Sequence, residues 1–205
     1  MRTRAFFPTL VYEARLPVAQ RRTLDQRLLR EALQLRKDDR AGRLWSRDNY
    51  RGGYTSYGSL CRLQTISPTF ARLEQLLDVH ARRYARVLDF DLRGRKLAMT
   101  DCWVNLMARG VAHGLHLHPQ SVISGTYYVQ VPDGSAAIKF EDPRLDRFMA
   151  APPRHARSSA GRRTWVSLPA AEGKLVLFES WLRHEVPTQP VSALRVSVSF
   201  NYGWF

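Results

Sequence analysis

The stretch HGLHLHPQS, residues 113–121, concentrates imidazole side chains in a short space. His113, His116 and His118 lie within six positions of a chain that has six histidines in all. Side chains two residues apart on an extended segment point to the same side, so His116 and His118 can direct two ring nitrogens at one point. Metal sites often pair a histidine with an acidic residue two positions later, and here His118 stands where the acid would be. The pattern indicates a metal site that lacks its usual carboxylate.

Three residues further along the chain could complete such a site. His184 follows the β-rich run KLVLF, and Arg195 and Ser197 lie in the last β-rich run. A distant histidine can close a facial set of three ligands, which leaves coordination positions open for a substrate and for dioxygen. Arg195 suits a carboxylate because its guanidinium carries a permanent charge and two parallel N–H donors. The order predicts a metal centre with an anion clamp beside it.

The N-terminal part of the chain shows helical spacing. Leucines recur on one face of the segment from Val18 to Lys37, which predicts an amphipathic helix. A second helix is expected from Ser67 to Leu88, because a serine cap precedes a proline at the first helical position. The glycines and small polar residues of NYRGGYTSYGS, residues 49–59, indicate a loop or bent strand between the two.

From residue 97 onward the pattern changes to short β-rich runs separated by turn signals. The runs cover residues 100–107, 121–131, 136–140, 164–168, 174–178 and 194–202. Helices followed by strands predict an α+β fold in one domain over residues 1–205. Its mainly helical N-terminal layer would span residues 1–96 and its strand core residues 97–205. The Arg-rich segment 144–163 lacks apolar periodicity and is expected to be a mobile insertion between strands.

Composition sets broad limits on the class of protein. An apolar share of 44% in 205 residues is enough for one sizeable core, and two cysteines are too few for a disulfide framework. No apolar run approaches the roughly 20 residues that cross a bilayer, so we expect a cytoplasmic protein without a membrane partner. The net charge of +14 would attract acidic partners, nucleic acid among them. The basic residues are spread along the chain, which does not favour a dedicated nucleic-acid module.

Taken together, the motifs resemble the iron(II)- and 2-oxoglutarate-dependent oxygenases. The resemblance narrows to a 2OG-Fe(II) oxygenase family whose members share an HxHP and SGvYYv core, a DPR turn, an FPSWLxHxV segment and an RxSxSFN ending. The chain carries these motifs as HLHPQSVISGTYYV, EDPR, FESWLRHEV and RVSVSFN, and it opens with FFPT and RGGYTS where the family has phenylalanine-proline and GGY. The resemblance covers nearly the whole chain.

This resemblance implies a double-stranded β-helix of the jelly-roll or cupin-like type, braced by the N-terminal helices, and an enzyme that uses Fe(II) and 2-oxoglutarate. It makes His116 and His184 metal ligands and assigns Arg195 with Ser197 to the distal carboxylate of 2-oxoglutarate. Tyr128 matches a strand tyrosine that reaches the same carboxylate in relatives. The expected reaction is hydroxylation of a C–H bond in a small-molecule or peptide substrate, with release of succinate and CO2.

The roles of two side chains, Asn105 and His118, can each be interpreted in more than one way. Asn105 is a candidate cofactor-binding residue that could face the iron or the substrate, or it could satisfy neighbouring backbone groups. His118 is favoured as the third ligand because it occupies the slot of the acid, and Pro119 holds it extended. Alternatively His118 turns away, or Asp142 or Glu179 supplies a carboxylate instead. His113 is expected to lie beside the site, as a loop residue or a support for a ligand.

The functional alternatives belong to different classes. One is a three-histidine, cupin-like dioxygenase that does not use 2-oxoglutarate, against which the Arg195-x-Ser197 pair argues. The other is a basic nucleic-acid-binding module with a degenerate metal site, whose affinity would fall steeply with salt. For the oxygenase, the loop at residues 51–59 and the segment 144–163 are expected to set specificity, and the positive charge predicts an acidic or carboxylate-bearing substrate.

Overall fold

The chain forms its helices first and most of its strands later, as the sequence pattern predicts. A computed structural model describes the backbone of residues 1–205 and every side chain except those of residues 147 and 148. The elements, in chain order, are β1 (Val11–Arg15), α1 (Val18–Asp38), α2 (Arg40–Asn49), β2 (Tyr54–Thr55), α3 (Leu63–Ile66), α4 (Pro68–Val87), β3 (Leu97–Met107), β4 (His113–His116), β5 (Ile123–Gln130), β6 (Ile138–Glu141), the 3-10 helices η1 (Leu145–Phe148) and η2 (Ala160–Arg162), β7 (Trp165–Leu168), β8 (Lys174–Glu179), β9 (His184–Val186) and β10 (Arg195–Trp204).

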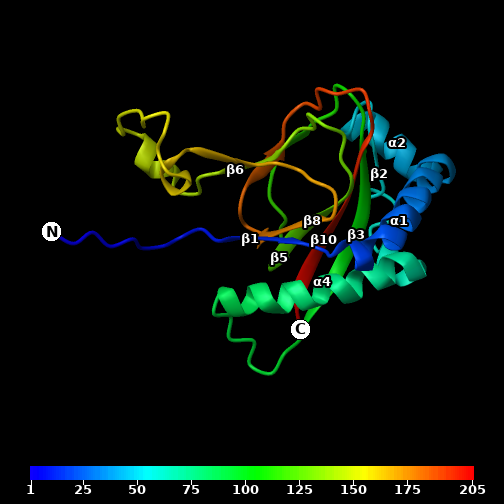
Figure 1. The fold of residues 1–205 in the computed structure, drawn as a ribbon, viewed down its shortest axis with the longest axis horizontal. Coiled ribbons are helices and arrows are strands. Elements are labelled where there is room, and N and C mark those ends of the chain that lie inside the picture. Colours follow the sequence, from blue (N-terminus) through cyan, green and yellow to red (C-terminus); the bar gives the residue numbers. More distant parts are fainter.

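Two antiparallel sheets form the core of the fold. The larger sheet has the order β1-β8-β5-β10-β3-β2, and the smaller one has the order β4-β9-β6-β7. Apolar side chains from both sheets, among them Tyr128 and Phe178 from the larger and Ile138 and Phe140 from the smaller, pack in one cluster between them. This α+β arrangement is the double-stranded β-helix that the motifs imply, and the helices gather on one side of strands β3 and β10 (Figure 1).

The two long helices cover the outer face of the larger sheet. Helix α4 starts where predicted, because the Ser67 hydroxyl accepts hydrogen bonds from the backbone N–H groups of Thr69 and Phe70 and Pro68 follows the cap. Helix α1 buries Leu24 and Leu28 against the same core. Both helices contact the sheet, α4 at β3 and α1 at β5. They leave the opposite face of the sheet free to line a site.

Strand alternation divides the larger sheet into an apolar face and a polar face. On β10, Val196, Val198 and Phe200 belong to the core under the helices, and the residues between them are Arg195, Ser197, Ser199 and Asn201. Successive strand residues point to opposite faces, so these four share the face that looks toward the smaller sheet. Strands β3 and β5 follow the same rule. The motif RVSVSFN therefore encodes one apolar face and one functional face.

Several short elements were missed by the sequence pattern. Helix α2 and strand β1 were not predicted, and β1 pairs with β8 at the edge of the larger sheet. Strand β2 lies within the predicted loop or bent strand of residues 49–59 and pairs with β3. Strands β4 and β9 are only four and three residues long. The pattern could not show them because such short runs carry too few residues for a period to be recognised.

The segment 144–163 lies between β6 and β7, as predicted, and carries η1 and η2. It projects from the side of the molecule opposite the helices (Figure 1, yellow). Within the described part of the chain, no helix combines the length and apolar character that a membrane span requires. The histidines are positioned by the sheets, because His116 lies on β4 and His184 on β9, and not by the segment 144–163.

Candidate metal and 2-oxoglutarate site

Strand pairing brings the three candidate ligands together. In the smaller sheet His116 of β4 lies opposite His184 of β9. His118 follows the end of β4, and its backbone N–H donates to the Ser180 carbonyl at 3.0 Å. One potential ligand atom from each of the three imidazoles lies within 4.8 Å of the others. This separation suits coordination of a single ion, because two imidazole nitrogens at about 2.1 Å from a metal are about 3 to 4 Å apart.

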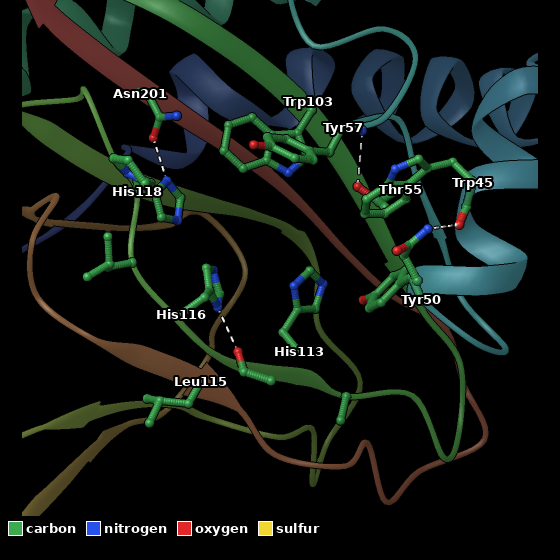
Figure 2. A pocket seen from close by; sticks show the side chains of 15 residues that line it. Trp45, Tyr50, Thr55, Tyr57, Trp103, His113, Leu115, His116, His118 and Asn201 are labelled. Atoms are coloured by element: carbon green, nitrogen blue, oxygen red, sulfur yellow. Dashed lines mark hydrogen bonds between the residues drawn. The ribbon is translucent and has the colours of Figure 1, made fainter.

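Each of the three imidazoles uses its Nδ1 atom in a hydrogen bond. His116 Nδ1 lies 2.7 Å from the Gly114 carbonyl oxygen, and His118 Nδ1 lies 2.6 Å from Asn201 Oδ1 (Figure 2). His184 Nδ1 lies 2.9 Å from the Leu182 carbonyl oxygen. All three partners are oxygen acceptors, so Nδ1 must carry the hydrogen. In a neutral ring Nε2 then keeps its lone pair, which is the state a metal ligand needs.

Burial keeps these imidazoles neutral. The pKa of His184 is lowered to about 3, mainly by burial and to a lesser extent by the neighbouring His116. Desolvation also lowers the pKa of His118 to about 4, although the bond to Asn201 opposes this shift. The pKa of His116 moves down for the same reason. Neutral rings at pH 7 are the form that binds a cation, so no proton has to be displaced at neutral pH.

Behind the histidines lies a small inner cavity with a charged residue in its wall. Arg195 is 3% exposed, and its guanidinium carbon lies 5.0 Å from the centre of the Tyr128 ring. Among the described residues it has no acidic partner; its Nε atom is buried without a hydrogen bond, and one terminal nitrogen donates to the Met107 sulfur. A buried cation without a counter-charge is costly. The arrangement is therefore complete only with an anion in the cavity.

The other predicted clamp residues line the same cavity. Ser197 pairs with Asn105 on one neighbouring strand and with Tyr128 on the other, so the three form a row across β3, β10 and β5. The Tyr128 hydroxyl and Asn105 Oδ1 are buried without a hydrogen-bond partner. Asn105 Nδ2 donates to Ser199 Oγ at 2.9 Å. The sheet thus presents two further unsatisfied polar atoms close to Arg195.

On the other side of the histidines a larger outer cavity opens to solvent. Its volume is about 510 Å³, and its wall includes the aromatic rings of Trp45, Tyr57 and Trp103 (Figure 2). The Tyr57 ring centre lies 6.0 Å from that of Trp45 and 5.1 Å from that of Trp103, so the rings form one continuous aromatic wall. No Lys, Arg, Asp or Glu side chain lines this cavity among the described residues.

The loop that follows α2 is held in place by Asp39. This residue caps α2 through the backbone N–H of Gly42 and accepts hydrogen bonds from the hydroxyls of Tyr54 and Ser59. A Cβ atom on Gly58 would lie 2.3 Å from the Trp45 ring, so only glycine lets that ring pack flat on the loop. The loop at residues 51–59 therefore does border the site, as expected.

His113 lies closer to the reaction centre than the sequence suggests. Its ring lines both cavities and is centred 6.2 Å from the His116 ring and 4.3 Å from the Tyr50 ring. The Tyr50 hydroxyl is buried without a partner. Alternation places His113 and His116 on opposite sides of a regular strand, but the pairing with β9 shifts register between them. Such a bulge returns both rings to one side, and no sequence signal announces it.

The two carboxylates considered as alternative metal ligands, those of Asp142 and Glu179, lie away from both cavities. Asp142 accepts hydrogen bonds from the guanidinium and the backbone N–H of Arg144. Glu179 lies on β8 close enough to Tyr84 of α4 to affect the pKa of that residue. Neither residue lines the inner or the outer cavity. None of the described side chains of the segment 144–163 lines them either, so the geometry of these residues gives no support to the expected influence of the segment on specificity.

A family comparison agrees with these features. Residues 101–201 match a family model described as "Putative 2OG-Fe(II) oxygenase". The chain belongs to the 2OG-Fe(II) oxygenases. This oxygenase therefore uses Fe(II) and 2-oxoglutarate. The match does not support the two alternative functions, which were a cupin-like dioxygenase without 2-oxoglutarate and a nucleic-acid module with a degenerate metal site. No curated protein matches the chain by sequence.

Solved structures place the oxygenase in the same fold. A prolyl-4-hydroxylase of Pseudomonas putida is 15% identical, with a TM-score of 0.60 over 96% of this chain and 94% of that one. SnoN, an alpha-ketoglutarate-dependent epimerase from nogalamycin biosynthesis, is 15% identical, with a TM-score of 0.61 over 95% and 78%. HygX of Streptomyces hygroscopicus, solved with nickel, 2-oxoglutarate and hygromycin B, is 14% identical, with a TM-score of 0.58 over 95% and 83%.

Proposed function

We propose that this oxygenase hydroxylates a C–H bond of a small-molecule or peptide substrate held in the outer cavity. In this proposal His116, His118 and His184 bind Fe(II), and Arg195, Ser197 and Tyr128 bind 2-oxoglutarate in the inner cavity, which Asn105 also lines. The observation that carries it is the buried guanidinium of Arg195, which lacks an acidic partner and faces the same space as the three imidazoles.

The residues divide the reaction into binding, orientation and exclusion of water. When bound, Fe(II) and 2-oxoglutarate activate dioxygen, so that one oxygen atom enters the substrate C–H bond and the other enters succinate as CO2 leaves. Arg195 would hold the distal carboxylate by charge-assisted hydrogen bonds, and the Tyr128 hydroxyl, which makes no hydrogen bond among the described residues, would donate to the same group. The apolar packing between the sheets would keep bulk water from the clamp.

Asn105 fits the end of the clamp that lies nearer the histidines. Its Oδ1 atom is free in a buried position, and its Nδ2 atom is held by Ser199. A carbonyl oxygen fixed in this way accepts hydrogen bonds and does not donate them. We therefore expect Asn105 to accept from a water molecule or from the substrate, whereas Arg195 and Tyr128 supply the donors to 2-oxoglutarate.

The outer cavity defines what the substrate can offer. A volume of about 510 Å³ lies in the range of small-molecule sites, roughly 300–1,000 Å³. The net charge predicts an acidic substrate, but no basic side chain in the described lining could bind a carboxylate there. We therefore expect the reacting part of the substrate to be uncharged and to pack against the aromatic wall, with any acidic group outside the cavity. A panel of neutral and acidic compounds, scored by the 2-oxoglutarate consumption that each stimulates, tests this expectation.

The ligand set is tested by anaerobic titration with Fe(II) and 2-oxoglutarate. His118→Ala should weaken metal binding by about 10-fold or more, because one of three protein ligands is lost. His118→Asp restores a ligand in the slot and should keep most of the affinity. Equal binding by the wild type and both variants would reject His118 as a ligand.

Coupling is tested separately by product analysis. In the wild type, 2-oxoglutarate consumption should release succinate in equal amount.

Asp142→Asn and Glu179→Gln serve as matched controls for the metal titration, because both remove a charge outside the cavities and should leave metal affinity unchanged. A loss of metal binding in either control would revive the alternative carboxylate.

A further inference from the structure

The three candidate ligands differ in what supports them. His116 and His184 rest on backbone carbonyl oxygens, of Gly114 and Leu182. His118 alone rests on a side chain, through the 2.6 Å contact between its Nδ1 and Asn201 Oδ1. Asn201 is 6% exposed and lies on β10, in the larger sheet, whereas the two backbone supports lie beside the strands of the smaller sheet. The orientation of His118 therefore depends on one amide.

An amide can present either its oxygen or its nitrogen, so something must fix which end faces His118. Asn201 Nδ2 lies 3.3 Å from the Asp101 carboxylate, and the hydroxyl of Ser124 donates to Asn201 Oδ1 at 2.8 Å. A carboxylate only accepts hydrogen bonds, so the amide nitrogen faces Asp101 and the oxygen faces the histidine. The buried pair Ser124 and Ser180, whose hydroxyls lie 2.8 Å apart, packs beside the amide.

We propose that Asn201 is the positioning residue that fixes the tautomer and ring orientation of His118, and that Asp101 fixes the orientation of Asn201. The oxygen of the amide accepts the Nδ1 hydrogen of His118, so Nε2 carries the lone pair and points at the other two imidazoles. His118 thus takes the position where relatives have an acidic metal ligand. The Asp101 carboxylate is not a ligand in this proposal, but it acts on His118 through Asn201. This inference rests on the proposed role of His118 as a ligand.

The two members of the relay should differ in importance. Asn201 touches His118 directly, with a short contact, and without it the Nδ1 hydrogen has no acceptor in a largely buried site. Asp101 acts through a longer contact and also accepts from the Thr100 hydroxyl. Partners of this kind typically change metal affinity by about 10-fold to 100-fold. We expect the loss of Asn201 to fall within this range and the loss of Asp101 to have a smaller effect.

The tautomer is tested directly, without turnover. Long-range ¹H–¹⁵N NMR of the metal-free protein, in which the two ring nitrogens of each histidine are distinguished, should show His118 protonated at Nδ1 in the wild type. Asn201→Leu keeps the size of the side chain but removes the acceptor, and should give a mixture of tautomers. Asn201→Asp keeps an acceptor at the same place and should restore the wild-type tautomer. An unchanged His118 tautomer in Asn201→Leu would overturn the proposal.

Metal affinity gives the second readout, measured by anaerobic calorimetry with Fe(II). Asn201→Leu should bind about 10-fold or more weakly, Asn201→Asp close to the wild type, and Asp101→Ala several-fold more weakly. The control is Tyr202→Phe, which removes a hydrogen bond to Asp78 on the helix side of the same strand and should lower stability without changing affinity. If Asn201→Asp binds as weakly as Asn201→Leu, the acceptor role is wrong.

The same measurements separate failure of the relay from failure of the ligand assignment. If His118→Ala binds Fe(II) as tightly as the wild type, the proposed ligand set is wrong and the relay has no purpose. If His118→Ala binds weakly but Asn201→Leu binds normally, only the relay is wrong.

Discussion

The inner and outer cavities share the histidines but are built from different parts of the chain. The inner wall comes from three adjacent strands, β3, β10 and β5, whose cross-strand pairs fix Asn105, Ser197 and Tyr128 in one row. Most of the outer wall comes from α2, the loop after it and the segment that carries the histidines, and the larger sheet adds Trp103 of β3 and Asn201 of β10. A sheet buried under two helices holds side chains more tightly than a loop does. Under the proposed function, cosubstrate binding belongs to the rigid part and substrate choice to the adaptable part.

Arg195→Leu should give the largest effect and tests the inner cavity. Loss of charge-assisted hydrogen bonds to a carboxylate, each worth about 1.5–3 kcal/mol, predicts at least a 100-fold loss of 2-oxoglutarate affinity. The free energy of unfolding of the ligand-free protein should not fall, because a buried cation without an acidic partner is replaced by an apolar side chain. Calorimetric titration and urea unfolding measure the two quantities. A large drop in stability with normal 2-oxoglutarate binding would show that Arg195 supports the fold and not the ligand.

A pair of glycine substitutions compares the rigidity of the two walls. A Cβ atom on Gly125 of β5 would lie 2.7 Å from both Leu177 and Phe200, which are fully buried, whereas a Cβ on Gly58 would meet only the Trp45 ring. Overpacking a core costs about 1–3 kcal/mol. We expect Gly125→Ala to reach the upper end of this range and Gly58→Ala the lower end, because the loop can shift. Urea unfolding measures both, and equal costs would contradict the contrast between the walls.

The sequence predicted the inner wall far better than the outer one. Alternation on RVSVSFN and the match to the family motifs indicated Arg195, Ser197 and Tyr128 without any knowledge of the fold. Asn201 lies in the same motif, yet its contact with His118 joins residues 83 positions apart, and no local pattern reports such a contact. The role of Asn201 therefore became visible only when strand β10 was placed beside the histidine segment.

The outer wall was difficult for a different reason. Helix α2 is only ten residues long, so it offers too few positions for a helical period to be recognised, and Trp45 could not be assigned to any surface. His113 was expected beside the site, but its place in the lining of both cavities depends on a register shift in β4 that the sequence does not reveal. The positive charge of the chain is not reflected in the described lining of the outer cavity, which contains no arginine. Side chains that depend on a bulge or on a loop are thus the ones that sequence patterns miss.

Acid sensitivity tests the histidines that form the border between the cavities. In the metal-free protein, burial lowers the pKa of His184 to about 3 and that of His118 to about 4, compared with about 6.5 in an unfolded chain. As the pH falls below about 6.5, the unfolded state binds protons that the folded state does not, so stability should decrease steadily toward pH 4. Urea unfolding with a chelator at pH 7, 5.5 and 4 measures this loss. His118→Gln should reduce the slope, and an unchanged slope would contradict the contribution of this ring.

The smallest expected effect concerns Tyr50, whose buried hydroxyl lies beside His113 at the junction of the two cavities. Tyr50→Phe should leave the stability of the ligand-free protein unchanged or slightly higher, because an unsatisfied buried hydroxyl is removed. If that hydroxyl donates to a bound ligand, one neutral hydrogen bond of about 1 kcal/mol predicts a loss of affinity of about 5-fold. Titrations with 2-oxoglutarate and with a substrate identified in the panel show which ligand it serves. A change for the substrate alone assigns Tyr50 to the adaptable wall, a change for 2-oxoglutarate alone extends the rigid clamp beyond the sheet, and no change for either removes Tyr50 from both.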